Sequence, residues 1–191
     1  LHHIPHLHTI AATSDMGYVT SMLTTLIQDM KLTNAGITKA NGAKKISEFE
    51  ENTGLCIPRH LTVFDEYQIA IKNAGENKKE VLGSFEEAAR LGRNVGYNLL
   101  LCSQDADSNV APILGTFQNR FCLKCDSKIS ELVLGNGQAV QGRVGLIFAN
   151  NNPNAHNYED NQRFFVPLQR DEDFLELGRF LEDKGKATGF K

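Results

Sequence analysis

Apolar side chains recur at helical spacing along residues 17–32 (GYVTSMLTTLIQDMKL). The apolar positions of this segment form one stripe on an otherwise polar rod: Met22, Leu23, Leu26, Ile27 and Met30. Such a stripe predicts an amphipathic helix. A connector that contains glycine and lysine is expected at 36–45, and the polar segment KKISEFEENTG at 44–54 predicts a helix that stops at Gly54.

The next segment, LTVF at 61–64, is short and apolar throughout. A run of this kind is typical of a strand that is covered on both faces. Residues 149–161 have the composition of an exposed hairpin loop. Elsewhere the two periodicities alternate, with helices expected at 78–93, 110–118, 127–135 and 171–185, and strands at 97–104, 120–125 and 144–150. This alternation predicts a mainly parallel α/β sheet with helices on both faces.

Three polar side chains stand at the carboxyl ends of predicted strands, where ligands of such sheets bind. Asp65 and Glu66 follow the strand at 61–64, and Gln104 ends the neighbouring strand. Asp65 can hold a Mg²⁺ ion, directly or through water, while Glu66 polarises the water that attacks a terminal phosphate. Gln104 can orient that water, because a carboxamide both donates and accepts hydrogen bonds. Alternatively, all three are solvated residues at strand ends.

Two arginines, Arg90 and Arg93, lie near the end of the predicted helix at 78–93. An arginine can reach across a subunit boundary and stabilise the charge on a phosphoryl group during its transfer. The alternative is that these cations cap the C-terminal end of their own helix.

Phosphate binding at such a site requires a glycine-rich loop of the form G-x-x-x-x-G-K-[ST]. The 191 residues contain no match. The nearest candidate, ATSDMGYV at 12–19, places Tyr18 and Val19 where lysine and serine or threonine belong. Either the chain carries a non-functional loop or the loop lies outside it.

Composition narrows the classes of function. The length fits one domain with a substantial core, and 41% of the residues are hydrophobic. A net charge of -3 excludes a global basic field of the kind that binds nucleic acid non-specifically. No apolar run is long enough for a transmembrane helix. Four cysteines in apolar surroundings favour a reducing, cytosolic setting over a secreted disulfide scaffold.

Two further patterns suggest metal or redox chemistry. LHHIPHLH at 1–8 holds four of the six histidines, but no carboxylate or cysteine partner lies nearby in the sequence. Cys122 and Cys125 have C-x-x-C spacing, yet positions three apart on a strand face opposite sides. Neither pattern is therefore expected to form a site.

Taken in order, the segments resemble the motor domain of the FtsK/SpoIIIE family, hexameric RecA-like ATPases that include DNA translocases and the EssC/EccC motors of type VII secretion. The similarity covers nearly the whole chain and rests on IPHLHTIAATSD, MLTTLIQDMKLTNAGI, KKISEFEENTG, IPRHLTVFDEYQ, AARLGRNVGYNLLLCSQDAD, ILGTFQNRFCLKCDSKISELVLGNGQAVQGRVGLIFAN and FVPLQRDEDFLELGRFLEDKG. It implies that residues 1–191 form a single RecA-like P-loop NTPase core.

The resemblance also implies roles for single residues. Asp65 would be the Walker B acid on the magnesium side, Glu66 the catalytic carboxylate and Gln104 a sensor of the nucleotide. Arg93, three residues before Gly96, falls where the family places an arginine that acts on the neighbouring subunit's site. ATP and Mg²⁺ would be the cofactors, and a hexameric ring of identical subunits the assembly.

The chain also departs from the family. There the Pro-His-Leu segment follows the phosphate-binding loop, so residue 1 is expected to lie downstream of that loop. The chain would then be the C-terminal two-thirds of a motor domain that lacks its N-terminal βα unit, and alone it would be inactive. DADS at 105–108 replaces the residues that often follow the family's glutamine, in the loop that faces the substrate.

Three functions follow from these observations. The first is an ATP-driven translocase of double-stranded DNA. The second is a motor with a protein cargo, as in type VII secretion or conjugative coupling, which the segments GRNVG at 92–96 and GRVGLIFANNN at 142–152 suit. The third is a non-hydrolysing module for binding or assembly. A soluble domain at the cytoplasmic face of a bacterial membrane, anchored only through segments outside this chain, is expected from the resemblance.

Overall fold

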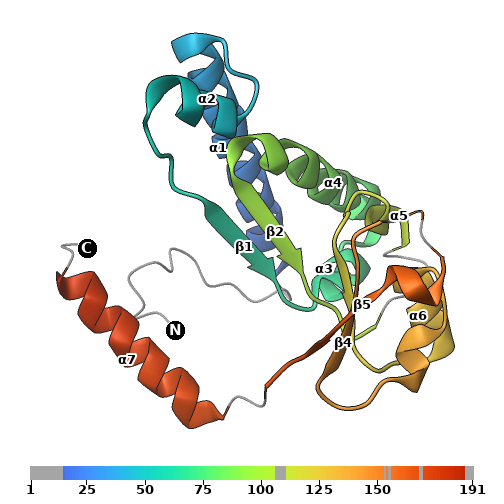
Figure 1. Ribbon diagram of the computed structural model, residues 1–191. Helices are drawn as coiled ribbons and strands as arrows, with labels where there is room; N and C mark the ends of the chain where they lie inside the picture. Colours follow the sequence, from blue (N-terminus) through green and yellow to red (C-terminus); the bar gives the residue numbers. More distant parts are fainter. Residues whose placement is uncertain (1–14, 106–110, 153, 155, 168–169, 188–191) are drawn as a thin grey trace.

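A computed structural model describes residues 15–105, 111–152, 154, 156–167 and 170–187 of the chain (Figure 1). The α-helices are α1 (Met16–Asn41), α2 (Ile46–Thr53), α3 (Tyr67–Asn73), α4 (Lys78–Val95), α5 (Ala111–Leu114), α6 (Ser127–Leu134) and α7 (Asp171–Ala187). Short 3-10 helices are η1 (Gly75–Asn77), η2 (Gln138–Gln141) and η3 (Tyr158–Asp160). The strands are β1 (His60–Phe64), β2 (Tyr97–Leu101), β3 (Arg120–Cys122), β4 (Leu146–Asn150) and β5 (Gln162–Phe165).

The first helix is longer than the sequence predicts, because it runs through most of the expected connector and ends only at Asn41. Its start is set by Asp15, whose carboxylate accepts a hydrogen bond from the Tyr18 backbone N–H at 3.1 Å. Gly42 ends it in the left-handed conformation. Residues 16–19 are therefore helical and form no phosphate-binding loop, while residues 12–14 lie outside the described part.

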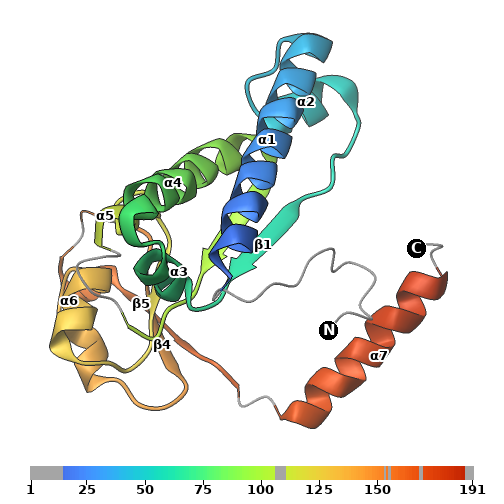
Figure 2. The ribbon, with the colours of Figure 1, turned by 180° about the vertical axis from the view of Figure 1, so that it is seen from behind.

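Strands β1 and β2 pair in parallel, in register from His60 opposite Tyr97 to Phe64 opposite Leu101. The connection between them runs through α3 and α4, and α1 packs along α4 on the same side of the strands (Figures 1 and 2). Two apolar clusters fill this layer. One gathers around Leu23, Phe64 and Phe85, and the other around Met30, Ala88 and Val95.

A second, antiparallel sheet has the strand order β3-β4-β5. Helix α6 packs against β3, and a third cluster forms between them from Cys122, Leu134, Ala139 and Phe148. The predicted hairpin loop at 149–161 does join two adjacent antiparallel strands, β4 and β5. Residues 153 and 155 of this loop lie outside the described part.

The prediction of a mainly parallel sheet is therefore wrong. The described residues form one two-stranded parallel sheet and one three-stranded antiparallel sheet. A helix between two strands predicts parallel pairing only when it returns the chain to the same end of the sheet. Between β3 and β4 the chain passes through the short helices α6 and η2 instead, and it enters β4 from the opposite end.

The prediction that the strand at 61–64 is covered on both faces is also wrong. Leu61, Val63 and Leu100 point away from the helices and are 67%, 52% and 42% exposed. The chain leaves this sheet after β2 and builds the second sheet, so among the described residues nothing returns to the open face. We call these three side chains the open apolar face of the β1–β2 sheet.

Helix α7 lies apart from both sheets in the two opposite views (Figures 1 and 2). Its apolar side chains are exposed, among them Phe174, Leu175, Leu177 and Phe180. Within the described part of the chain, no helix combines the length and apolar character that crossing a membrane requires.

Candidate functional site

The ends of β1 and β2 are held side by side by backbone hydrogen bonds. The Cys102 N–H donates to the Phe64 carbonyl at 2.8 Å, and the Tyr67 N–H donates to the Cys102 carbonyl at 3.2 Å. The residues that follow each strand, Asp65 and Glu66 on one side and Gln104 on the other, therefore meet at one edge of the sheet. This is the arrangement that the sequence predicts.

Glu66 adopts a left-handed backbone conformation, with φ 54° and ψ 40°. It is the only residue other than glycine with a positive φ in the described part of the chain. Such a conformation costs a residue with a side chain about 1–3 kcal/mol, and it recurs at functional sites. Here it turns the chain sharply from β1 into α3.

The carboxylate of Glu66 is fixed by two donors. Its Oε2 atom accepts a hydrogen bond from the side-chain Nε2 of Gln68. The same oxygen lies 3.5 Å from the backbone nitrogen of Gln104, which donates from the end of the neighbouring strand. A half-buried carboxylate is thereby held in one position at the strand ends.

Sequence reasoning missed Gln68. Its side chain is only 4% exposed, and its Oε1 atom has no hydrogen-bond partner within the described residues. A buried amide usually satisfies both of its polar groups. The available signal was an amide beside the acid pair in the otherwise apolar segment YQIAI.

Asp65 is exposed to solvent beside the fixed Glu66. The charges of both carboxylates reach the thiol of Cys102: burial, and then the negative charges of Asp65 and Glu66, raise the pKa of Cys102. The two acids thus form a region of negative potential at the strand ends, which suits a hydrated cation.

The backbone N–H of Gln104 contacts Glu66. The predicted sensor role requires the Gln104 side chain instead, and this side chain is exposed to solvent. The chain after Gln104 is tied to α3, because Asp105 forms an ion pair with Lys72 at 3.3 Å. Residues 106–108, the rest of the predicted substrate-facing loop, lie outside the described part.

Arg93 is exposed in the last turn of α4, at the opposite end of the strands. Gly96, which ends that helix, accepts a hydrogen bond from the His60 N–H at the start of β1. Five residues of strand separate this point from the acid pair, or about 16 Å. The structure therefore does not bring Arg93 or its neighbour Arg90 to Glu66 within one chain.

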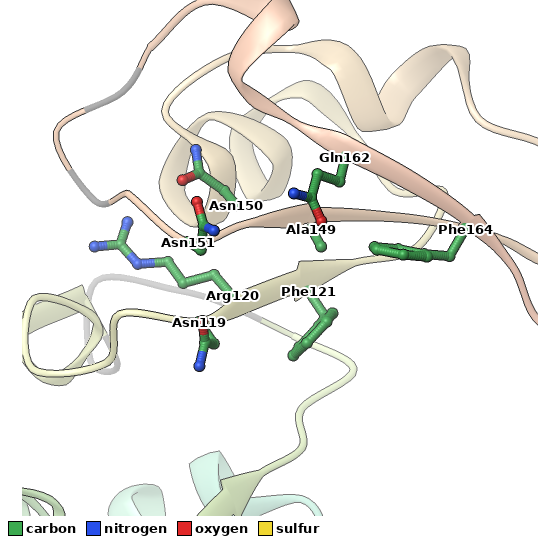
Figure 3. A pocket seen from close by; sticks show the side chains of 8 residues that line it. All are labelled: Asn119, Arg120, Phe121, Ala149, Asn150, Asn151, Gln162 and Phe164. Atoms are coloured by element: carbon green, nitrogen blue, oxygen red, sulfur yellow. The ribbon is translucent and has the colours of Figure 1, made fainter. Parts of the chain in front are cut away.

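The acid pair lies at an edge of the sheet that solvent reaches, since Asp65 is exposed and Glu66 half-buried. A hollow of about 620 Å³ lies between α1 and the start of α4, lined by Thr20, Ser21 and Asn77 among others. Another, of about 170 Å³, lies on the antiparallel sheet between Phe121 and Phe164 (Figure 3). None of the predicted site residues lines either hollow.

The residues present fit one half of a site for magnesium and nucleotide. Within the described part of the chain, no three histidine, cysteine or acidic side chains gather as a metal site would require. Asp65 and Glu66 are hard oxygen donors of the type that Mg²⁺ prefers, and Mg²⁺ commonly takes only one or two carboxylates beside substrate phosphates and water. The half that would bind phosphates is not among these residues.

No protein-family model matches the chain, and no curated protein matches it either. Solved structures do match. The conjugation coupling protein TcpA of pCW3, in a monomer form with ATPγS, aligns with a TM-score of 0.67 and 24% sequence identity, over 85% of this chain and 49% of TcpA. The cytoplasmic domain of the type VII secretion ATPase EccC of Thermomonospora curvata aligns with a TM-score of 0.74 and 19% identity, over 94% of this chain and 22% of that one.

The predicted structural similarity to FtsK/SpoIIIE-family ATPases is thereby confirmed at the level of the fold. The chain has a mixed α/β fold that matches P-loop ATPase structures, with small sheets. It spans about half the length of the TcpA chain and about a fifth of the EccC chain. The roles of Asp65, Glu66, Gln104 and Arg93 stay predictions.

Proposed function

We propose that the chain is part of an ATP-driven motor of the conjugation-coupling or type VII secretion kind, and that it contributes the catalytic acid and the metal-side acid. The observation that carries this proposal is the position of Glu66, whose carboxylate is fixed by Gln68 and by the Gln104 backbone at the end of a parallel strand. Similarity to TcpA and EccC supports the fold that such a motor requires.

Glu66 accepts the proton of the attacking water in this proposal. A general base must be held within hydrogen-bond reach of that proton, and the two donors to its carboxylate hold it in place. Asp65, solvated and adjacent, would hold the water shell of a Mg²⁺ ion, and the Gln104 side chain orients the nucleophile. A bound Mg²⁺ ion would neutralise the charge that develops on the phosphates.

The loop that binds the phosphates comes from outside these 191 residues in the proposed motor. Strand β1 supports this, because among the described residues it pairs only with β2 and its other edge is available to a further strand. Parallel sheets are normally covered on both faces, and Leu61, Val63 and Leu100 form an apolar face that such an added βα unit would bury.

The cargo is proposed to be protein in preference to double-stranded DNA. The net charge of -3 offers no overall attraction to a polyanion, and one of the two matched structures is named for type VII secretion. The motor would act at the cytoplasmic face of a bacterial membrane, as a ring of identical subunits.

The test is ATP hydrolysis by the full-length protein that contains this chain, compared with Glu66→Gln. Removing a general base lowers kcat by about 10²- to 10⁴-fold, while nucleotide binding is retained. Glu76→Gln, the same charge change at an exposed position in η1, is the matched control and keeps wild-type turnover.

Hydrolysis that survives Glu66→Gln contradicts the assigned role, and a full-length protein that hydrolyses no ATP makes the domain a non-catalytic module. Adding long duplex DNA separates the cargo classes. A DNA motor gains turnover and loses DNA affinity steeply as salt rises, whereas a protein-cargo motor responds to neither.

A further inference from the structure

The two cysteines of the CLKC segment lie together, contrary to the sequence expectation. Their sulfur atoms are 3.4 Å apart. Positions three apart would face opposite sides only if the strand continued, but β3 ends at Cys122. The chain then turns, and Asp126 caps α6 by accepting a hydrogen bond from the Ile129 N–H at 2.9 Å. The turn brings the Cys125 side chain back onto that of Cys122.

The two thiols differ in their surroundings. Cys122 is 5% exposed and packs with Leu134, Ala139 and Phe148 between β3 and α6. Cys125 is half-buried at the rim of this cluster. Burial and the hydrogen bond with Cys125 raise the pKa of Cys122 well above its usual range. Cys125 is therefore the thiol that a dissolved reagent reaches first, and Cys122 is the buried thiol next to it.

Metal binding does not account for the pair. Structural zinc sites take four ligands, and within the described residues no third histidine, cysteine or acidic side chain joins these two. A disulfide requires sulfur atoms about 2.05 Å apart. The sulfurs must approach by roughly 1.4 Å to reach that bond length.

We propose that Cys122 and Cys125 are a site of reversible thiol oxidation, at which a low-molecular-weight disulfide such as glutathione disulfide converts the dithiol to an intramolecular disulfide. The Cys125 thiolate attacks one sulfur of the glutathione disulfide, whose S–S bond breaks, and one glutathione thiolate leaves. Cys122 then gives up its proton and attacks the Cys125 sulfur, which releases the second glutathione. Two protein thiols and one glutathione disulfide thus yield one protein disulfide and two glutathione thiols.

The bond would join the end of β3 to the residue before the α6 cap, so it would fasten the helix to the antiparallel sheet. The cysteine pair belongs to the antiparallel sheet, whereas Glu66 follows a strand of the parallel sheet. This inference does not rest on the proposed ATPase function.

The experiment equilibrates the reduced full chain in glutathione buffers with a rising fraction of glutathione disulfide, quenches with acid and alkylates the remaining thiols. Trypsin cleaves after Arg120, Lys124 and Lys128, so each cysteine of the pair falls on its own peptide. We expect the peptides 121–124 and 125–128 to be recovered joined by a disulfide. The mass of the joined product is about 2 Da lower than the sum of the two peptides with free thiols. Dithiothreitol separates them again, and neither peptide is joined to one that carries Cys56 or Cys102.

Two kinds of variant sharpen the result. In Cys122→Ser the attacking thiol has no resolving partner, so Cys125 retains one glutathione as a mixed disulfide. Cys56→Ser and Cys102→Ser are the matched controls, and the joined peptides form in both. The proposal is overturned if both peptides are alkylated at every buffer ratio, if wild-type Cys125 stops at the mixed disulfide, or if Cys122 or Cys125 pairs with another cysteine or with a second chain.

Discussion

Glu50 shows how one side chain joins an element to the strand that carries the site. Its two carboxylate oxygens accept hydrogen bonds from the two terminal nitrogens of Arg59, at 2.8 and 2.6 Å, and Oε1 also accepts from the Ile57 N–H at 2.9 Å. A bidentate pair of this kind fixes both side chains in one geometry. It ties α2 to the segment that leads into β1.

This pair predicts a specific dependence of stability on pH. The hydrogen bonds from Arg59, and then from the Ile57 backbone, lower the pKa of Glu50 from 4.5 to about 2. A lowered folded-state pKa stabilises the protein above pH 4.5, and that contribution is lost as the pH falls from 4.5 towards 2. When thermal melts are recorded across this pH range, the melting temperature of wild type should fall more steeply than that of Glu50→Gln.

Solvent reaches the pair, with the Arg59 side chain 45% and the Glu50 side chain 21% exposed, so added salt should shrink the difference between the two proteins. Glu51→Gln, at the exposed neighbouring position, is the control and should follow the wild-type pH profile. Parallel profiles for wild type and Glu50→Gln would contradict the assignment.

At the scale of elements, one glycine of α4 allows this helix to lie close to β2 and α1. A Cβ atom at Gly92 would lie 2.4 Å from the Tyr97 carbonyl oxygen of β2 and 3.3 Å from Cε of Met30 in α1. Gly83 lies in the same helix, where a Cβ atom would meet nothing within 4 Å. The two glycines therefore have opposite roles in one helix.

The same substitution at these two positions should change stability in opposite directions. Alanine is a better helix former than glycine by about 1 kcal/mol, so Gly83→Ala should raise the free energy of unfolding by up to that amount. Gly92→Ala forces the helix away from β2 and α1 and should lower it by about 1–3 kcal/mol net. Urea denaturation measures both, and a Gly92→Ala protein as stable as wild type would refute the close packing.

On the scale of the whole molecule, the predicted residues divide between two ends of the parallel sheet. Asp65, Glu66 and Gln104 lie at the carboxyl ends of the strands, and Arg93 lies at their amino ends. The five-residue strand between these two ends is about 16 Å long, so the structure does not bring Arg93 to the acid pair of its own chain. This placement agrees with the prediction that Arg93 acts on the site of a neighbouring subunit in a ring.

Mixed assemblies of the full-length protein test this division. Glu66→Gln and Arg93→Ala should each abolish most ATP hydrolysis when present alone. In an equal random mixture, about a quarter of the interfaces pair an intact Glu66 with an intact Arg93 from the next subunit, so about a quarter of wild-type turnover should return. Mixing Glu66→Gln with the double variant Glu66→Gln, Arg93→Ala is the control and should restore nothing. If the first mixture also stays inactive, Arg93 does not act between subunits.

The sequence by itself determined most of the helices and strands and the acid pair at the end of β1, whereas the helix α3 (Tyr67–Asn73) was not predicted. These features depend on neighbours within a few residues: the stripe around Leu23 and Met30, and an apolar run that ends in two carboxylates. Their boundaries differ in the structure. Helix α1 continues to Asn41, the helix expected at 110–118 covers only Ala111–Leu114, and the strand expected at 120–125 ends at Cys122.

Only the tertiary structure decided which elements meet. Strand pairing depends on contacts between residues far apart in the chain, so local periodicity did not reveal the antiparallel β3-β4-β5 sheet or the open apolar face at Leu61, Val63 and Leu100. The left-handed turn at Glu66, with Gln68 bound to its carboxylate, arises where β1 must turn into α3. The meeting of Cys122 and Cys125 has the same origin, because it depends on where a strand stops, which its composition does not encode.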